Sequence, residues 1–249
     1  MPKPRAGTLF VGVGGWNFAP WRGTFYPEDL TQARELHYAS RQLTSIEINS
    51  TFYGLQKPAT FRKWRDDTPD GFVFSVKAPR FVTNRKLLAT AGPSIERFLE
   101  SGVLELGARL GAINWQLPPG KRFDAEDVAA FLALLPRKLG GRVLRHALEV
   151  RDETFDNEEL IAIAARHEVA IVEAGDSEYP RITARTAPFG YLRVMGSKAS
   201  SPKGYTPAAL KRWREHAQTL AREGDVYFYF ISGAKERNPL AAKAFIAAL

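Results

Sequence analysis

The pattern of apolar and polar positions divides the chain into short apolar runs that alternate with longer, helix-like segments. Eight apolar runs have five to seven residues each, the usual length of a buried strand. They cover residues 8–13, 45–49, 72–78, 111–117, 146–150, 169–174, 191–195 and 226–231. Seven helix-like segments lie between or after these runs, at residues 27–41, 58–67, 94–106, 125–139, 157–168, 206–224 and 238–249. The alternation predicts an α/β fold in which helices connect parallel strands.

Eight such strands over residues 1–249 predict one domain, a (β/α)8 barrel of the TIM type. The connection between the sixth and seventh strands, residues 176–190, is the exception, because its helix is weak or absent. A doubly wound open sheet would give the same alternation and is the alternative. The strand count and the lack of a compositional break favour the barrel. The expected helix starts carry capping or first-turn residues, namely Asp124, Asn157, Thr206, Pro207 and Pro239.

Side chains alternate across a strand with a period of two, so each strand can be divided into two faces. In five of the predicted strands one face holds large apolar residues, and the other holds smaller residues that become polar toward the C-terminal end. In a barrel the large apolar face contacts the helices and the other face points inward. Polar groups from several strands should therefore meet at the C-terminal mouth, and the expected set is Glu47, Asn49, Lys77, Gln116, Glu149, Arg151 and Arg193.

The charge of the chain favours an anionic partner. Lys and Arg number 35 against 27 Asp and Glu, and the formal net charge is +8. The polar set at the mouth sums to about +1, before the basic loops around it are counted. Those loops contribute Arg80, Arg85, Lys86, Lys198 and Lys203. The loop GSKASSPKG, residues 196–204, follows the seventh strand, where barrels commonly bind phosphate.

Aromatic residues are concentrated in the loop after the first strand. Five of them lie within eleven residues, namely Trp16, Phe18, Trp21, Phe25 and Tyr26. We expect most of these rings to form a small core that folds the loop over the barrel edge. Trp16 is nearest the strand end and is the best candidate for a ring that faces a ligand. Phe52 and Tyr53 follow the second strand and lie close by in a barrel.

The sequence lacks the residue types that several kinds of chemistry require. The chain has no cysteine, which excludes disulfides, thiolate metal sites and cysteine nucleophiles. Its four histidines do not form a metal spacing, so no metal or other cofactor is expected. Magnesium held by Glu47, Glu149 and Asp176 is an unsupported alternative. No membrane-spanning segment or secretory signal is evident, so we expect a cytoplasmic protein without a membrane partner.

Longer stretches carry a family resemblance. The segments GVGGW, SIEINSTFYGLQKPATFRKW, FVFSVKAP, GAINWQLPP, ALEVRDETF and YLRVMGS resemble the YecE-like family, known as domain of unknown function 72, over nearly the whole chain. The resemblance implies a (β/α)8 barrel and does not imply an established activity. The family pattern matches at Gly15, Trp16, Glu47, Asn49, Tyr53, Lys77, Gln116, Glu149, Arg151 and Arg193. It is not matched at Asn84, Phe155, Met195, Ser232 and Lys243, which implies a changed or lost activity if the histidines of relatives move protons.

The first functional hypothesis is an enzyme, of the hydrolase or lyase type, that acts on a phosphorylated or other anionic small molecule. Glu47 or Glu149 would be the general base or acid, and Lys77 a proton donor, an electrostatic stabiliser or a nucleophilic amine. The expected substrate-binding residues are Trp16, Asn49, Tyr53, Gln116, Arg151 and Arg193.

Two alternatives stay open. One is a nucleic-acid-binding or phosphodiester-acting barrel that uses the basic loops and the exposed aromatic rings. The other is a degenerate barrel that binds a ligand without chemistry. Glycoside hydrolysis by Glu47 and Glu149 is disfavoured, because the surrounding cations oppose the raised pKa that a catalytic acid needs. The sequence does not indicate an oligomeric state.

Overall fold

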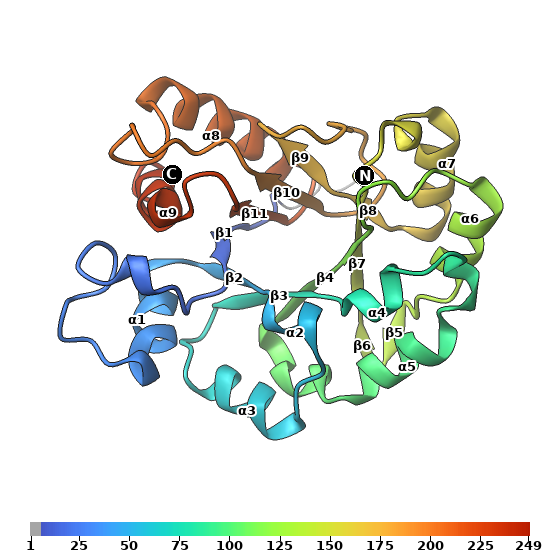
Figure 1. The fold of residues 1–249 in the computed structure, drawn as a ribbon, viewed down its shortest axis with the longest axis horizontal. Coiled ribbons are helices and arrows are strands. Elements are labelled where there is room, and N and C mark those ends of the chain that lie inside the picture. Colours follow the sequence, from blue (N-terminus) through green and yellow to red (C-terminus); the bar gives the residue numbers. More distant parts are fainter. Residues whose placement is uncertain (1–5) are drawn as a thin grey trace.

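The computed structural model describes residues 6–249, and a ring of parallel strands lies at its centre (Figure 1). The nine strands of this sheet are β1 (Leu9–Gly14), β2 (Ser45–Ile48), β3 (Val73–Lys77), β4 (Leu110–Gln116), β7 (Arg145–Glu149), β8 (Ala170–Ile171), β9 (Glu173–Gly175), β10 (Gly190–Val194) and β11 (Val226–Phe230). Their order is β8-β7-β4-β3-β2-β1-β11-β10-β9, and every neighbouring pair is parallel.

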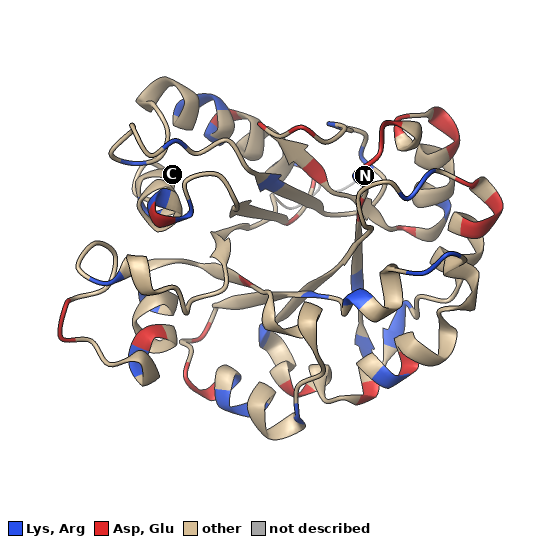
Figure 2. Cartoon of the chain, in the orientation of Figure 1, with Lys and Arg blue, Asp and Glu red and all other residues tan. Residues whose placement is uncertain are grey.

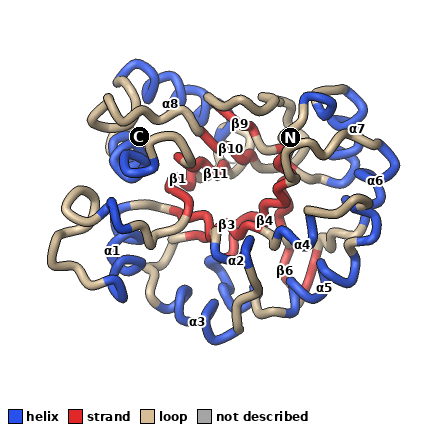
Figure 3. The backbone as a smooth tube through the Cα atoms, viewed as in Figure 1, coloured by secondary structure: helices blue, strands red, loops and turns tan. Residues whose placement is uncertain are grey.

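The two ends of this sheet are halves of the strand expected at residues 169–174, and they close the ring (Figure 3). The first half, β8, pairs with β7, and the second half, β9, pairs with β10. Between them the amide of Val172 still donates to the carbonyl of Leu148 at 2.9 Å. The chain thus turns from one neighbour to the other within one strand, and the predicted eight-stranded barrel is confirmed.

Helices surround the ring of strands (Figure 1). The α-helices are α1 (Glu35–Gln42), α2 (Ser50–Tyr53), α3 (Pro58–Asp66), α4 (Arg80–Thr83), α5 (Gly92–Glu100), α6 (Ala125–Ala133), α7 (Glu158–His167), α8 (Pro207–Ala221) and α9 (Asn238–Ile246). Asp124, Asn157 and Thr206 each accept a hydrogen bond from a first-turn amide, which confirms the predicted caps. In the described part of the chain, no helix combines the length and apolarity needed to cross a membrane.

Three expected helices differ from the observed ones by more than three residues at one end. The helix expected at 125–139 ends at Ala133, and a short antiparallel hairpin of β5 (Lys138–Leu139) and β6 (Arg142–Val143) follows. Pro136 lacks an amide hydrogen, so the helix cannot continue through this position. The expected helix 94–106 stops at Glu100, because Gly102 takes a left-handed φ of 109°. The expected helix 27–41 becomes α-helical only at Glu35, where α1 begins.

The connection from β9 to β10 contains no helix over residues 176–189, all of which the structure describes. This agrees with the weak or absent helix that the sequence predicts.

The apolar core has two separate clusters, one on each side of the sheet. The outer cluster joins strand residues such as Ile46, Trp115 and Val194 to the helices. The inner cluster fills the barrel with small residues and the tyrosines of β10 and β11, among them Tyr227. Tyr229 also points inward, where its hydroxyl lies 2.6 Å from Ser45 Oγ and 2.8 Å from Ser75 Oγ. The division confirms the predicted faces, so polar side chains on the inner face must lie inside the ring.

Candidate active site at the barrel mouth

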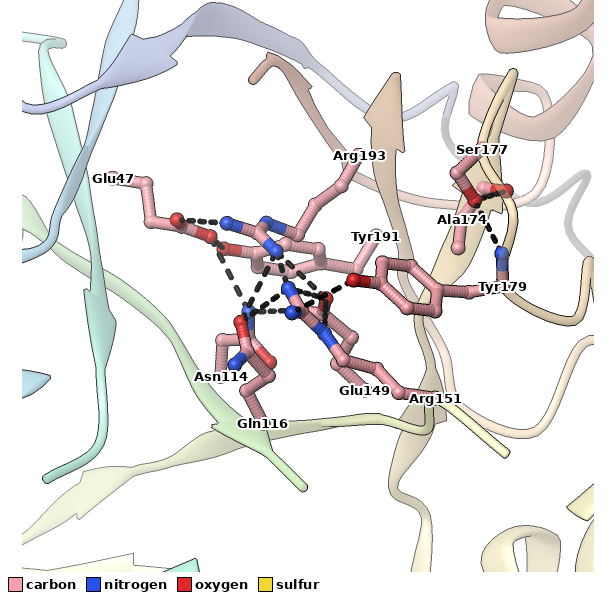
Figure 4. Close-up of polar contacts among 10 residues, drawn as sticks. All are labelled: Glu47, Asn114, Gln116, Glu149, Arg151, Ala174, Ser177, Tyr179, Tyr191 and Arg193. Carbon is pink, nitrogen blue, oxygen red and sulfur yellow. Dashed lines mark hydrogen bonds and ion pairs between the residues drawn. The ribbon is translucent and has the colours of Figure 1, made fainter. Parts of the chain in front are cut away.

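Arg193 lies at the centre of the polar side chains inside the barrel (Figure 4). It comes from β10 and is 2% exposed. Its Nη1 donates to both carboxylate oxygens of Glu149, at 2.7 and 2.6 Å, and its Nη2 donates to Glu47 Oε1 at 3.0 Å. Burial opposes the positive charge, but Glu149 and Glu47 raise the pKa of Arg193 and keep it charged. One guanidinium therefore joins two carboxylates from two other strands.

Hydrogen bonds from β4 and β10 complete the surroundings of Glu47. Tyr191 donates from its hydroxyl to Glu47 Oε2 at 2.6 Å. Asn114 Nδ2 lies between the two carboxylates, 3.3 Å from Glu47 Oε2 and 3.1 Å from Glu149 Oε2. Burial and the carboxylate of Glu47 raise the pKa of Tyr191 well above its ordinary value, so its proton stays on the hydroxyl. Figure 4 shows these side chains converging from different strands.

Arg151 extends the network toward the mouth of the barrel. Its Nε and Nη2 donate to Glu149 Oε1 at 3.1 and 2.9 Å, and its Nη2 also donates to Gln116 Oε1 at 2.8 Å. The guanidinium lies 4.5 Å from the ring centroid of Tyr179, whose hydroxyl accepts from Nη1 at 3.3 Å. These contacts fix Arg151 beside the opening, although it follows the strand and is partly exposed.

Glu149 is held as a carboxylate. Burial alone would raise its pKa, but the guanidiniums of Arg193 and Arg151 outweigh burial and lower the pKa to about 2. A group with this pKa carries no proton near neutral pH. Glu149 therefore cannot donate a proton there, and its geometry suits a structural anion that orients the two arginines.

Above this network a cavity of about 640 Å³ opens at the carboxyl ends of β1, β2, β3 and β11. Six of the nine expected site residues line it, namely Trp16, Asn49, Tyr53, Lys77, Arg151 and Arg193. Glu47, Gln116 and Glu149 do not line the cavity and lie in the hydrogen-bond network below it. The expected site residues thus meet in one place but occupy two layers.

The charges of the cavity wall have one sign. Its charged residues in the described chain are Lys77, Arg151, Arg193 and Lys235, and no acidic residue lines it. With the carboxylates of Glu47 and Glu149 counted beneath the floor, the site keeps a net formal charge of about +2. Figure 2 shows charged positions on the central strands as well as around the outer helices. A cavity of this kind should favour a bound anion.

Lys77 enters the cavity from the end of β3. Its Nζ lies 4.0 Å from the ring centroid of Phe52. Burial and the neighbouring charge of Arg193 lower the pKa of Lys77 to about 8, although the carboxylates of Glu47 and Glu149 act in the opposite direction. About a tenth of this amine is therefore unprotonated at pH 7, far more than for an ordinary lysine.

Asn49 presents an unsatisfied oxygen beside the cavity. Its Oδ1 is buried and accepts no hydrogen bond from the described chain. Gly14 makes room for this side chain, because a Cβ at position 14 would lie 2.5 Å from Asn49 Nδ2. A buried oxygen without a donor is costly, so a ligand with a hydrogen-bond donor would fit this wall.

Most aromatic rings of the first loop form a small core, as expected. Trp21, Phe25 and Tyr26 are buried against one another, with Tyr38 packed beside them. Trp16 stays partly exposed and lines the cavity. Phe18, Trp21, Tyr53, Trp64 and Phe230 also contribute to the cavity wall.

The basic loops contribute less than the sequence suggests. No residue of 196–204 lines the cavity, and the loop closes on itself through hydrogen bonds such as Lys198 N to Gly204 O at 2.7 Å. Arg85 donates to Ser94 Oγ and to nearby carbonyls. The expected phosphate loop after the seventh strand therefore lies outside the site, and Lys235, which follows β11, takes its place in the cavity wall.

Several residues of the hydrogen-bond network and of the cavity wall were not expected from the sequence. Asn114 and Tyr191 lie on the inner faces of their strands, so the alternation that found Glu47 could also have nominated them. Lys235 and Trp64 belong to no strand, so the alternation of side chains along strands could not identify them. Of the positions that depart from the family pattern, Ser232 lines the cavity.

His146 holds a structural position beneath the outer face of the sheet. His146 is buried, and burial lowers its pKa to about 4. Its Nδ1 accepts from Trp115 Nε1 at 3.0 Å, and its Nε2 donates to the carbonyl of Pro136 at 2.9 Å.

Asp176 accepts from Trp213 Nε1 and does not line the cavity. Within residues 6–249 no group of three or more His, Cys, Asp or Glu side chains is arranged to hold a metal ion.

Comparisons with known proteins identify the family. The family model described as "Protein of unknown function DUF72" matches residues 10–249. The UPF0759 protein YecE of Escherichia coli is 28% identical over 150 residues, 59% of this chain and 50% of that protein. The UPF0759 protein YunF of Bacillus subtilis is 24% identical over 152 residues, 59% of this chain and 52% of that protein. The chain thus spans about half the length of the curated relatives it matches.

A solved structure extends the likeness to the fold. The crystal structure of a DUF72 family protein from Thermotoga maritima has a TM-score of 0.77 and 23% sequence identity, and the match covers 96% of this chain and 98% of that chain. Family model and fold agree with the resemblance drawn from the sequence. The chain belongs to the DUF72, YecE-like family.

Proposed function

We propose that this protein binds, and acts on, a small phosphorylated or otherwise anionic molecule at the C-terminal mouth of its barrel. One observation carries the proposal: the cavity wall holds four basic residues and no acidic residue of the described chain. Arg151 and Arg193 are fixed in place by Glu149, so they need no rearrangement to meet an anion.

The rest of the wall suits the uncharged part of such a molecule. Trp16, Tyr53 and Trp64 offer ring faces and edges that can contact a sugar or another flat carbon skeleton. Asn49 Oδ1 can accept a hydrogen bond from a hydroxyl group. A phosphorylated sugar or a related small metabolite combines these features. Lys77 is the group best placed to move a proton or stabilise charge on it.

Thermal unfolding in the presence of paired ligands tests the proposal. Ribose 5-phosphate should raise the melting temperature at millimolar concentration, and ribose should not, because only the former neutralises the cavity charge. Lys235→Met should weaken the binding of ribose 5-phosphate by roughly tenfold, because about one charge-assisted contact to its phosphate is lost. Lys211→Met is the matched control, since Lys211 lies on α8 with its side chain 66% exposed. Equal shifts with ribose and ribose 5-phosphate would refute an anion site.

A nucleic-acid partner is the second candidate, and one exposed ring favours it. Tyr53 is 72% exposed at the cavity rim, and the guanidinium of Arg80 lies 5.8 Å from its ring centroid. A base could stack on this ring, at about 1–3 kcal/mol per base. Binding of a single-stranded oligonucleotide should then fall steeply with salt and with Tyr53→Ala. Phe81→Ala is the control, because Phe81 is also exposed beside an arginine, Arg97. Oligonucleotide affinity that Tyr53→Ala leaves unchanged would remove this candidate.

A further inference from the structure

Lys77 is a buried lysine on a rigid support. The residue is 9% exposed and ends β3. Its carbonyl accepts from Thr51 Oγ1 at 2.7 Å, and the next amide, of Ala78, donates to the carbonyl of Asn114 at 2.9 Å. These bonds fix the backbone from two neighbouring elements. The side chain therefore reaches the cavity from a defined position, as a reacting group must.

The amine of Lys77 has an aromatic ring as its partner, and no carboxylate of the described chain pairs with it. Within residues 6–249 its Nζ makes no ion pair and no hydrogen bond, and it faces the ring of Phe52. Lys121 shows the contrast, because its Nζ contacts Asp127 Oδ2 at 2.8 Å. The face of the Phe52 ring attracts an ammonium, whereas burial of the side chain penalises its charge and lowers the pKa of Lys77.

The charged groups around Lys77 act on its pKa in both directions. Glu47 and Glu149 lie near enough to attract its charge, but both are already bonded to arginines. Burial first, and then Arg193, bring the pKa of Lys77 down to about 8. At pH 7.5 roughly a quarter of such amines are unprotonated, against about one in a thousand for an ordinary lysine. Lys77 is therefore nucleophilic under conditions where exposed lysines are not.

We propose that Lys77 forms an imine with the carbonyl group of a phosphorylated aldehyde or ketone bound in the cavity. The neutral amine attacks the carbonyl carbon and forms a carbon–nitrogen bond. The oxygen takes up two protons, both lost from the amine nitrogen in the course of the reaction, and leaves as water, so atoms and electrons balance without an oxidant or reductant. Once protonated on nitrogen, the imine withdraws electrons from the adjacent carbon, which assists proton removal or bond cleavage there.

The cavity explains why the carbonyl compound should carry a phosphate. Lys235 and Arg151 line the same cavity and can hold the anionic end while Lys77 meets the carbonyl. The proposal thus rests on the anion site described above and names the chemistry performed there. The volume of about 640 Å³ accommodates a molecule of this size.

Reductive trapping tests the imine on the whole protein. Pyridoxal 5′-phosphate and pyridoxal are each added at pH 7.5 with sodium cyanoborohydride, and the labelled lysines are identified by peptide mass spectrometry. With pyridoxal 5′-phosphate, labelling of Lys77 should exceed that of exposed Lys211 by roughly tenfold or more, because far more of its amine is neutral. Inorganic phosphate should suppress the labelling of Lys77 and leave that of Lys211 unchanged. Pyridoxal, which lacks the phosphate, should label Lys77 less.

The outcomes separate this proposal from the anion site itself. In Lys77→Arg, which keeps a cation but has no primary amine, the phosphate-suppressible labelling should disappear from the whole protein. Labelling of Lys77 no greater than that of Lys211 would overturn the imine, and so would labelling concentrated on Lys235. If ribose 5-phosphate still raises the melting temperature in that case, the anion site stands and the imine alone fails.

Discussion

Arg193 shows how a buried charge can be accommodated at a single residue. The free energy of removing a guanidinium from water is large, and it is offset here by two carboxylates and by correctly placed hydrogen bonds. Glu47 and Glu149 in turn receive donors from Tyr191 and Asn114. Each charged group therefore depends on its partners, and removal of one leaves the charges of the others buried without an opposite charge.

Arg193→Met should destabilise the protein by about 3–5 kcal/mol, because it leaves two buried carboxylates without their central cation. Urea denaturation followed by circular dichroism measures this loss. The control is Arg62→Met, which breaks a partly exposed ion pair with Glu105 and should cost about 1 kcal/mol or less. Similar losses in the two variants would contradict the central role given to Arg193.

Lys77 should make the free energy of unfolding depend on pH. Its pKa is lower in the folded state than in the unfolded chain, so the unfolded chain binds more protons between pH of about 8 and 10.5. The stability of the native protein relative to Lys77→Met should therefore rise across this window, by on the order of 3 kcal/mol in total. Denaturation of both proteins at several pH values measures the difference. A difference that stays constant from pH 7 to 11 would be inconsistent with a perturbed Lys77.

At the scale of the element, α6, α7 and α8 begin where the sequence supplies a side-chain cap. The α6 helix begins after Asp124 and ends before Pro136. The hairpin of β5 and β6 follows it, within the range expected to be helical and just beyond. Where such a cap is missing the start is harder to place, and the helix expected from residue 27 begins only at Glu35. The end of α5 depends on the left-handed Gly102, a stop signal that the sequence carries but that the apolar periodicity alone does not reveal.

Asp124→Ala should lower the stability of the protein by about 0.5–2 kcal/mol, because the amide of Asp127 loses its acceptor at the start of α6. Asp124→Asn keeps an acceptor of the same shape and should cost much less. Chemical denaturation of the three proteins ranks them. If the alanine and asparagine variants are equally destabilised, the carboxylate acts through its charge and not as a cap.

At the scale of the whole molecule, the alternation of side chains predicted the barrel and the meeting of its polar residues. Glu47 and Arg193 could be placed inside because a period of two leaves only two faces to choose from. The depth of each group could not be predicted, so Glu149 was expected at the mouth and lies beneath it. Lys235 escaped prediction because only closure of the ring brings the end of β11 beside β1.

The rate of amide hydrogen exchange should differ between the paired strands of the ring and the connection from β9 to β10. Over residues 176–189, no amide donates to a backbone carbonyl of the described chain, whereas β10 is paired on both sides. We expect these amides to exchange much faster than those of residues 190–194, because exchange from an unpaired amide needs no opening of the barrel. Mass spectrometry of deuterium uptake measures both segments. Comparable protection of the two would show that the connection is ordered by contacts other than backbone pairing.

The shared bonding of Arg193 also constrains how this family can diverge. A change at position 193 to an uncharged residue strands two negative groups in the interior, so such a change becomes tolerable only when an acid at position 47 or 149 is lost as well. Related sequences should thus replace these three positions in combination. An alignment rich in relatives that lack the arginine yet retain both acids would be incompatible with this interdependence.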